Sequence, residues 1–200
     1  MNSTISPSEQ AKTNKGKLSQ HNIIVATRKI LADQDLSSLK LDDVAALSGI
    51  AKSSVLWHFG SKNGLLLAVV DSIFSDIQTL LLQFTHEDNS QLSIEAQLKH
   101  LMSTLAQEMQ KTPEANALLI AFIVNKTLDK TIIQQVRLMY QNYRGAISEQ
   151  LFIRHLSFST SMATTLLAII DGVYLQWYLE PDNINLEQTL VASIDHIKLS

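Results

Sequence analysis

Side chains that could contact a nucleic acid lie close together between residues 52 and 62. Lys52 carries an ammonium group, which can bind a phosphate or a base edge. Ser53 and Ser54 are short and can donate or accept hydrogen bonds, so a backbone that carries them can approach a groove closely. Trp57 follows one helical turn later and offers an N–H to a phosphate and an apolar ring to a sugar or a thymine methyl group.

Two more side chains complete this candidate set. His58 lies beside Trp57, and Lys62 lies where a further helix begins, so its ammonium group and the free backbone amides after Ser61 could bind a phosphate. Three of these residues also have an interpretation without nucleic acid. Lys52 could be a solvated lysine, Trp57 could fill a core, and His58 could be a hydrogen-bonded structural histidine.

The stretch 41–59, LDDVAALSGIAKSSVLWHF, has the pattern of two short helices joined by a turn. Gly49 is typical of the left-handed cap that ends a helix. Ile50 is an apolar residue that can fix the turn to a core, and Val55 and Phe59 share one face of the second helix. The pattern predicts a helix-turn-helix, whose second helix reads a DNA groove.

Apolar residues recur at helical spacing in the rest of the chain, and no stretch alternates with the period of a strand. We expect further helices over 18–33, 62–84, 92–110, 114–125, 129–152, 160–179 and 186–198. The fold class predicted is therefore all-α, with about nine helices. We expect a disordered tail over 1–16, a DNA-binding domain over 17–64 with its motif at about 40–59, and a helical body over 65–200.

Charge is unevenly distributed between these parts. The whole chain has a formal net charge of -3, but residues 1–64 carry eight Lys or Arg against five Asp or Glu. A basic amino-terminal part on an acidic body favours phosphate contact by the first part alone.

Several other classes of protein lack support in the sequence. There is no cysteine, which excludes disulfides and thiolate chemistry, and there is no HExxH, GxSxG or phosphate-binding glycine loop, so we expect neither an enzyme nor a cofactor. The histidines form no recognisable ligand cluster, so no metal site is expected. The first residues lack an apolar signal segment, and the apolar run 162–170 is too short to span a bilayer, so we expect a cytoplasmic protein without a membrane segment.

Three motifs in one order, DDVAxLSGI, KSSVLWHF and GSKxxLLxAV, are similar to those of the tetracycline-repressor (TetR) family of transcriptional regulators. The close resemblance covers about 18–71. It implies a homodimer whose subunits each carry a DNA-binding domain and a larger domain for ligand binding and dimerisation. The implied partners are double-stranded operator DNA with a palindromic sequence and a small-molecule effector.

Four positions depart from the family pattern. The family usually has a hydroxyl residue where Ala51 stands and another where Leu39 and Lys40 stand, and commonly a tyrosine at the position of Leu56. It often has a glutamate where Gly64 stands, which would complete a capping box with Ser61. These departures leave fewer side chains for backbone contacts with DNA.

In the body, aromatic and methionine side chains could line a pocket for an apolar ligand. The candidates are His100, Met102, Phe122, Met139, Tyr143 and Trp177, with His155 and Asp171 as further polar anchors. The last two long helices are the expected dimer interface, with Ile169, Val173, Leu190, Ile194 and Ile197 as candidate contacts. Helical periodicity fits equally well with all these residues filling the core of one subunit.

The function predicted is a sequence-specific repressor that a small, largely apolar ligand releases from its operator. Two alternatives remain open from the sequence: a regulator or activator of the same fold that needs no ligand, and a helical small-molecule carrier or enzyme.

Overall fold

The computed structural model describes residues 7–86, 92–125, 128–154 and 160–197. Every regular element in them is helical, as the sequence predicts. The elements are α1 (Pro7–Asp33), α2 (Leu41–Ser48), α3 (Lys52–Phe59), α4 (Lys62–His86), α5 (Ile94–Lys111), α6 (Pro113–Val124), α7 (Lys130–Arg154), α8 (Thr160–Leu179) and α9 (Leu186–Ser193), followed by the short 3-10 helix η1 (Ile194–His196).

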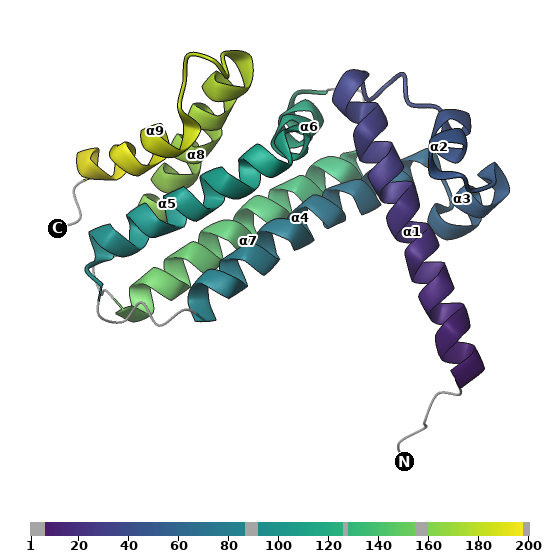
Figure 1. Cartoon of the computed structure of the whole chain (residues 1–200), viewed down its shortest axis with the longest axis horizontal. Helices are drawn as coiled ribbons and strands as arrows, with labels where there is room; N and C mark the ends of the chain where they lie inside the picture. The colour runs from purple at the N-terminus through teal and green to yellow at the C-terminus, as the bar shows by residue number, and fades with distance from the viewer. Residues whose placement is uncertain (1–6, 87–91, 126–127, 155–159, 198–200) are drawn as a thin grey trace.

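Helices α1, α2 and α3 gather at one end of the molecule, and α4 runs from them into the body beside α7 (Figure 1). Ile23 of α1, Val44 of α2, Val55 of α3 and Leu65 of α4 are buried in one core cluster. Helices α1, α2 and α3 bury little apolar surface by themselves, so the start of α4 completes their core.

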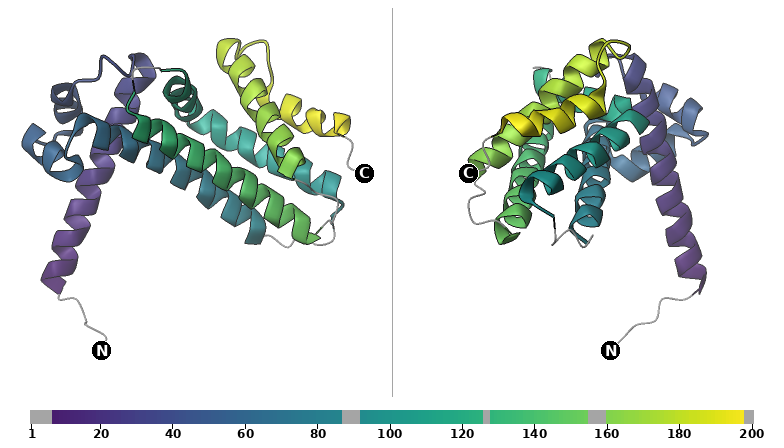
Figure 2. Two further views of the ribbon diagram at one scale, coloured as in Figure 1. Left: turned by 180° about the vertical axis from the view of Figure 1, so that it is seen from behind. Right: turned by 60° about the vertical axis from the view of Figure 1, so that its left-hand side comes forward.

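The same apolar cluster continues into the body. It also contains Phe122 of α6 and Ile132, Met139 and Tyr143 of α7. A second cluster joins α5, α8 and α9. Figures 1 and 2 show these three helices in the part of the body away from α2 and α3. Packing is therefore continuous between the amino-terminal helices and α4, α6 and α7.

Helix α1 begins earlier than the sequence predicts. Residues 7–16 are helical, where we expected a disordered tail, and residues 1–6 lie outside the described residues. Figures 1 and 2 show this first part of α1 projecting away from the rest of the molecule. Its Glu, Gln, Ala and Lys residues are good helix formers, which favours extension of the helix.

The predicted helix boundaries owe their accuracy to caps. Gly49 ends α2 in the left-handed conformation with φ 68°, and the side chain of Asn185 accepts a hydrogen bond from the Gln188 N–H at the start of α9. Thr112 precedes α6, but its hydroxyl donates to the Glu108 carbonyl and makes no cap hydrogen bond. Pro113 takes the first position of α6, where the N–H that proline lacks would have no partner within the helix.

The link between α1 and α2 is less polar than its composition indicates. Leu36 and Leu39 are both buried in the first cluster. Lys40 occupies the N-cap position of α2 and makes no side-chain cap hydrogen bond, and Leu39 before it contributes to the core.

Helix α8 is the one helix, among the described residues, that is long and apolar enough by composition to cross a membrane. The apolar run 162–170 is only a part of this helix, which spans the predicted range from Thr160 to Leu179 and includes Asp171. Core helices of soluble proteins pass the same test, and α8 packs on α7 and α9 with Leu166, Ile170 and Tyr174 buried.

Candidate nucleic-acid interface and ligand pocket

The two faces of α3 differ sharply. Val55 is buried beneath the helix, whereas Lys52, Ser53 and Trp57 are exposed and Ser54 is half-buried. The Trp57 side chain is 81% exposed, so the interpretation of this residue as core is wrong. Trp57 is a bulky, rigid aromatic residue exposed to solvent on the second helix of the helix-turn-helix, so it is available for contact with a partner.

Lys52 is not simply solvated. Its Nζ lies 2.8 Å from Oδ2 of Asp42 in the first turn of α2, and both side chains remain largely exposed. Water screens such a pair, so it contributes little to stability. The pair does hold the ammonium group at the start of α3, and a phosphate would have to compete with Asp42 for it.

Lys62 also has a partner within the chain. Its Nζ donates to the carbonyl oxygen of Ser37 at 2.9 Å, which ties the start of α4 to the link between α1 and α2. An ammonium group has three N–H donors, so this bond leaves others for a phosphate.

His58 lies between the exposed and buried sides of α3. Its ring meets the Trp57 ring edge to face, with centroids 4.8 Å apart. The buried Nδ1 has no hydrogen-bond partner among the described residues, so the structure does not support a hydrogen-bonded structural role. His58 instead packs against Trp57 and helps to fix its orientation.

The turn from α3 into α4 depends on glycine and serine. Ser61 accepts a hydrogen bond from the Gly64 N–H at 3.0 Å, which confirms it as the cap of α4. A Cβ at position 64 would overlap the carbonyl oxygen of Phe59, so this backbone has no room for the glutamate that the family often places there. Close approach of two backbone segments therefore explains this departure.

A cavity of about 480 Å³ opens in the body between α4, α5, α7 and α8, with α6 contributing at one end. Most of its wall is apolar: Ile73, Ile77, Leu80, Leu105, Met109, Ala115, Leu119, Ile147, Leu167 and Ile170. The polar lining groups are Asp76, Thr79, Glu108, Thr112, Tyr140, Tyr143 and Asp171. An apolar cavity with a few convergent polar groups is typical of a small-molecule site.

Of the six candidate pocket residues, Tyr143 lines this cavity. Met102, Phe122 and Met139 are buried in the two core clusters, Trp177 packs against the second cluster, and His100 is exposed on α5. Large apolar residues at helical spacing fill the core where two helices meet closely, and a cavity remains where they diverge. Asp171, named as a possible anchor, does line the cavity, and His155 lies outside the described residues.

The hydroxyl groups in the cavity have different surroundings. Tyr140 donates to Oδ2 of Asp171 at 3.1 Å, whereas the buried Tyr143 hydroxyl has no hydrogen-bond partner among the described residues. Burial raises the pKa of both phenols and of the Asp171 carboxyl above their ordinary values. The phenols therefore stay neutral, and the unpaired Tyr143 hydroxyl can bind a polar atom of a ligand.

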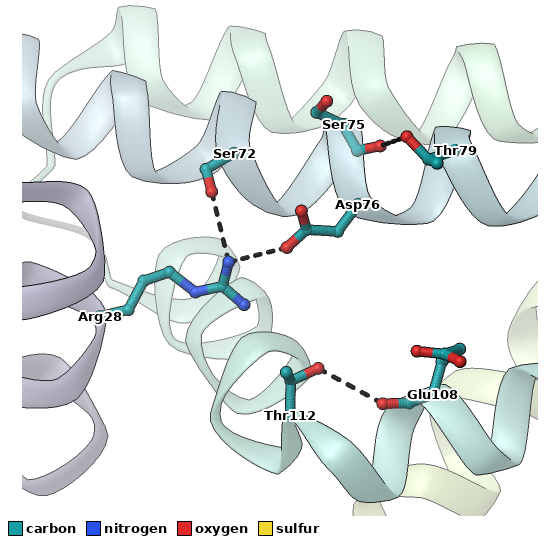
Figure 3. Close-up of polar contacts among 7 residues, drawn as sticks. All are labelled: Arg28, Ser72, Ser75, Asp76, Thr79, Glu108 and Thr112. Atoms are coloured by element: carbon teal, nitrogen blue, oxygen red, sulfur yellow. Dashed lines mark hydrogen bonds and ion pairs between the residues drawn. The ribbon is translucent and has the colours of Figure 1, made fainter. Parts of the chain in front are cut away.

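One ion pair joins the amino-terminal helices to the cavity wall (Figure 3). Nη1 of Arg28 on α1 lies 2.8 Å from Oδ2 of Asp76 and 3.3 Å from Oγ of Ser72, both on α4. The two residues are 48 positions apart in the sequence, so helical spacing does not reveal the pair. The side chain of Arg28 is only 11% exposed, so the pair is better shielded than a surface bridge.

The predicted dimer contacts divide into two groups. Leu190 and Ile194 are fully buried within one chain, against α5, so they are not available to a second subunit. Ile169, Val173 and Ile197 are half-buried at the edge of the same cluster. The alternative that such residues fill the core of one subunit is correct for the first two.

A helix-turn-helix with exposed basic and aromatic groups, followed by a helical body with a cavity, defines the class of helical DNA-binding regulators. Comparison with known proteins gives the same class. Residues 23–69 match the family model described as bacterial regulatory proteins, tetR family. The chain is 21% identical to the probable HTH-type transcriptional regulator ArpR of Pseudomonas putida over 202 aligned positions, which cover 89% of this chain and 90% of ArpR.

Solved structures share the fold. A transcriptional regulator from Rhodococcus sp. Rha1 superposes with a TM-score of 0.73 at 20% identity, covering 89% of this chain and 95% of that one. SmeT, the repressor of the Stenotrophomonas maltophilia multidrug efflux pump SmeDEF, gives 0.69 at 16% identity, covering 88% and 87%. The multidrug binding protein EbrR, complexed with malachite green, gives 0.65 at 17% identity, covering 88% and 96%.

Residues 23–69 belong to the tetR family of bacterial regulatory proteins, and the fold of the whole chain is that of TetR-family transcriptional regulators. Regulators of this family are not enzymes, which agrees with the absence of a catalytic motif from the sequence.

Proposed function

We propose that the protein is a cytoplasmic repressor that binds a palindromic operator as a homodimer and leaves it when a small, largely apolar ligand fills the cavity. The observation that carries the proposal is the position of α4. Only two residues separate the end of α3 from the start of this helix, and Ile73, Asp76, Ile77 and Leu80 place its later turns in the cavity wall. A ligand in the cavity therefore contacts the helix that supports the recognition helix.

On the DNA side, we propose that α3 enters the major groove. Lys52, Ser53 and Ser54 would meet base edges or flanking phosphates, and Trp57 would contact the sugar-phosphate backbone beside them. His58 would hold Trp57 in place, and Lys62 with the amides at the start of α4 would bind a phosphate. Among these, Lys52 and Trp57 are the most exposed to a partner.

The proposed dimer uses the outer side of α8. Leu175, Tyr178 and Leu179 are exposed there, and Ile169 and Val173 are half-buried on the same helix. Exposed large apolar residues gathered on one helix indicate an interaction surface. Two-fold pairing through α8 would present two recognition helices to half-sites about one helical turn, ~34 Å, or a multiple of it apart.

Release follows from linkage. If the ligand favours a different separation of the recognition helices from the one that DNA requires, each partner weakens the other by the same factor. SmeT is a repressor and EbrR a small-molecule binder of the same fold, which supports this reading. A regulator or activator that needs no ligand is the second candidate, although the cavity argues for a ligand.

The test begins with selection of bound duplexes from a random DNA pool, followed by a thermal-shift screen of apolar compounds. Compounds that raise the melting temperature should lower the affinity for the selected duplex. Stabilising compounds that leave that affinity unchanged would rule out a ligand-released repressor and favour the second candidate.

A further inference from the structure

The charged groups in the cavity wall all have one sign. Asp76, Glu108 and Asp171 line the cavity, and none of the lining residues is basic. Carboxylates without a lining cation repel an organic anion and offset the cost of moving an organic cation out of water. Tyr140 and Tyr143 also line the cavity, and an aromatic ring attracts a cation that lies over its face.

The three carboxylates are held by different partners. Glu108 pairs with Lys111 on its own helix at 2.6 Å, and Asp171 accepts the hydrogen bond of Tyr140. Asp76 alone, among the lining carboxylates, is bound by a cation from the amino-terminal helices, Arg28 of α1. It is therefore the one whose partner links the cavity to the DNA-binding part.

The pair between Arg28 and Asp76 is open to competition from the cavity. The Asp76 side chain is 60% exposed and faces the cavity, while Arg28 reaches it from outside the lining (Figure 3). Arg28 uses Nη1 alone for its bonds to Asp76 and Ser72, without the two-pronged geometry that makes arginine–carboxylate pairs strong. A cation in the cavity can thus approach the same carboxylate from the other side.

We propose that the cavity takes a lipophilic organic cation and that its charged group binds Asp76 in place of Arg28. Displacement of Arg28 removes the ionic contact between α1 and α4, and α1 packs directly on α2 and α3. The cation signals to the DNA-binding helices through α1, in addition to any movement of α4. This inference rests on the proposed function in taking the cavity as the effector site.

The experiment measures binding of two probes of nearly equal size and opposite charge, tetraphenylphosphonium and tetraphenylborate, by isothermal titration calorimetry on the full chain. Tetraphenylphosphonium is expected to bind at least about tenfold more tightly, because the lining carboxylates favour a cation. Asp76→Asn should weaken phosphonium binding about tenfold. Arg28→Gln should strengthen it by about threefold to fivefold, because the competing cation is gone.

The opposite signs of the two effects are the signature of competition. In the Asp76→Asn background, Arg28→Gln should no longer change the phosphonium affinity, which a double-mutant cycle measures. Asp71→Asn is the matched control: it removes a carboxylate from the same helix, but Asp71 bonds Gln135 and lies outside the lining. It should change the affinity by less than about twofold.

Three results would overturn the inference. Equal binding of the two probes, or no binding of the phosphonium, would reject a cation site. If Asp171→Asn weakened phosphonium binding and Asp76→Asn did not, Asp171 would be the carboxylate that binds the cation. Weaker phosphonium binding after Arg28→Gln would reject competition between Arg28 and the ligand. Because no DNA is present in this experiment, its failure is distinct from failure of the repressor proposal. A neutral ligand that releases the protein from DNA would support the repressor proposal and contradict the proposal of a cation site.

Discussion

Replacement of Gly64 by alanine should destabilise the protein, although alanine is the better helix former by about 1 kcal/mol. Gly64 is the third residue of α4, and an added Cβ would overlap the carbonyl oxygen of Phe59 and lie 3.1 Å from its carbonyl carbon. Both atoms are backbone, so the turn from α3 to α4 must move. Such overpacking costs about 1–3 kcal/mol, which outweighs the gain in propensity and gives a net loss of about 1 kcal/mol.

Urea unfolding at equilibrium measures this change, with Gly145→Ala as the matched control. Gly145 is an exposed residue inside α7, and no atom lies within 4 Å of a Cβ built there. The control should therefore gain about 0.5–1 kcal/mol. Because the turn at Gly64 positions α3, Gly64→Ala should also weaken operator binding. Equal stabilisation by the two substitutions would refute the close approach of Gly64 to Phe59.

Three further predictions concern the DNA face and the cavity. Lys52→Ala should weaken operator binding by about 1–3 kcal/mol, whereas Asp42→Asn should strengthen it because Lys52 is released from its ion pair. Fluorescence anisotropy measures both affinities, and an unchanged affinity for Lys52→Ala would show that Lys52 does not contact DNA. Trp57→Ala should lower operator affinity but change the free energy of unfolding by less than about 0.5 kcal/mol, since the side chain is 81% exposed, and a larger loss of stability would mean that it packs in the core. Burial raises the pKa of the Asp171 carboxyl above its ordinary value of 3.8, so the folded state keeps this proton to a higher pH than the unfolded state. The free energy of unfolding should therefore fall as the pH rises from 3.8 through the raised pKa. Urea unfolding at several pH values in this range should show the loss in the wild type and not in Asp171→Asn, and parallel profiles would contradict it.

Helices α2 and α3 and the start of α4 could be predicted closely because local chemistry determines them. Gly49 is the αL cap that ends α2, Ser61 caps α4, and Val55 and Phe59 face the core as their spacing requires. Such signals depend on a few neighbouring residues and on the helical period, so they can be read without the tertiary structure.

The cavity could not be predicted in the same way. Phe122 and Tyr143 are both buried aromatic residues on helices, yet only Tyr143 lines the cavity. The difference arises from how far α4, α5, α7 and α8 diverge, which periodicity does not encode. The pair between Arg28 and Asp76 depends on the same tertiary arrangement, since α1 and α4 meet only after the chain has folded.

The surface for dimerisation shows a related limit. Leu190 and Ile194 are apolar and four positions apart, as residues on the contact face of an interface helix would be. In this fold α5 covers them within one chain. Amphipathic spacing predicts that a face is covered and does not specify whether the same chain or a second one covers it.

A ligand in the cavity should lower the affinity of the protein for operator DNA. The direct measurement is an anisotropy titration of a labelled duplex, taken from the random-pool selection, with and without a saturating compound that raises the melting temperature. We expect a palindromic selected sequence and an affinity that falls by at least about fivefold when the compound is present. An affinity that is the same with and without the bound compound would contradict it.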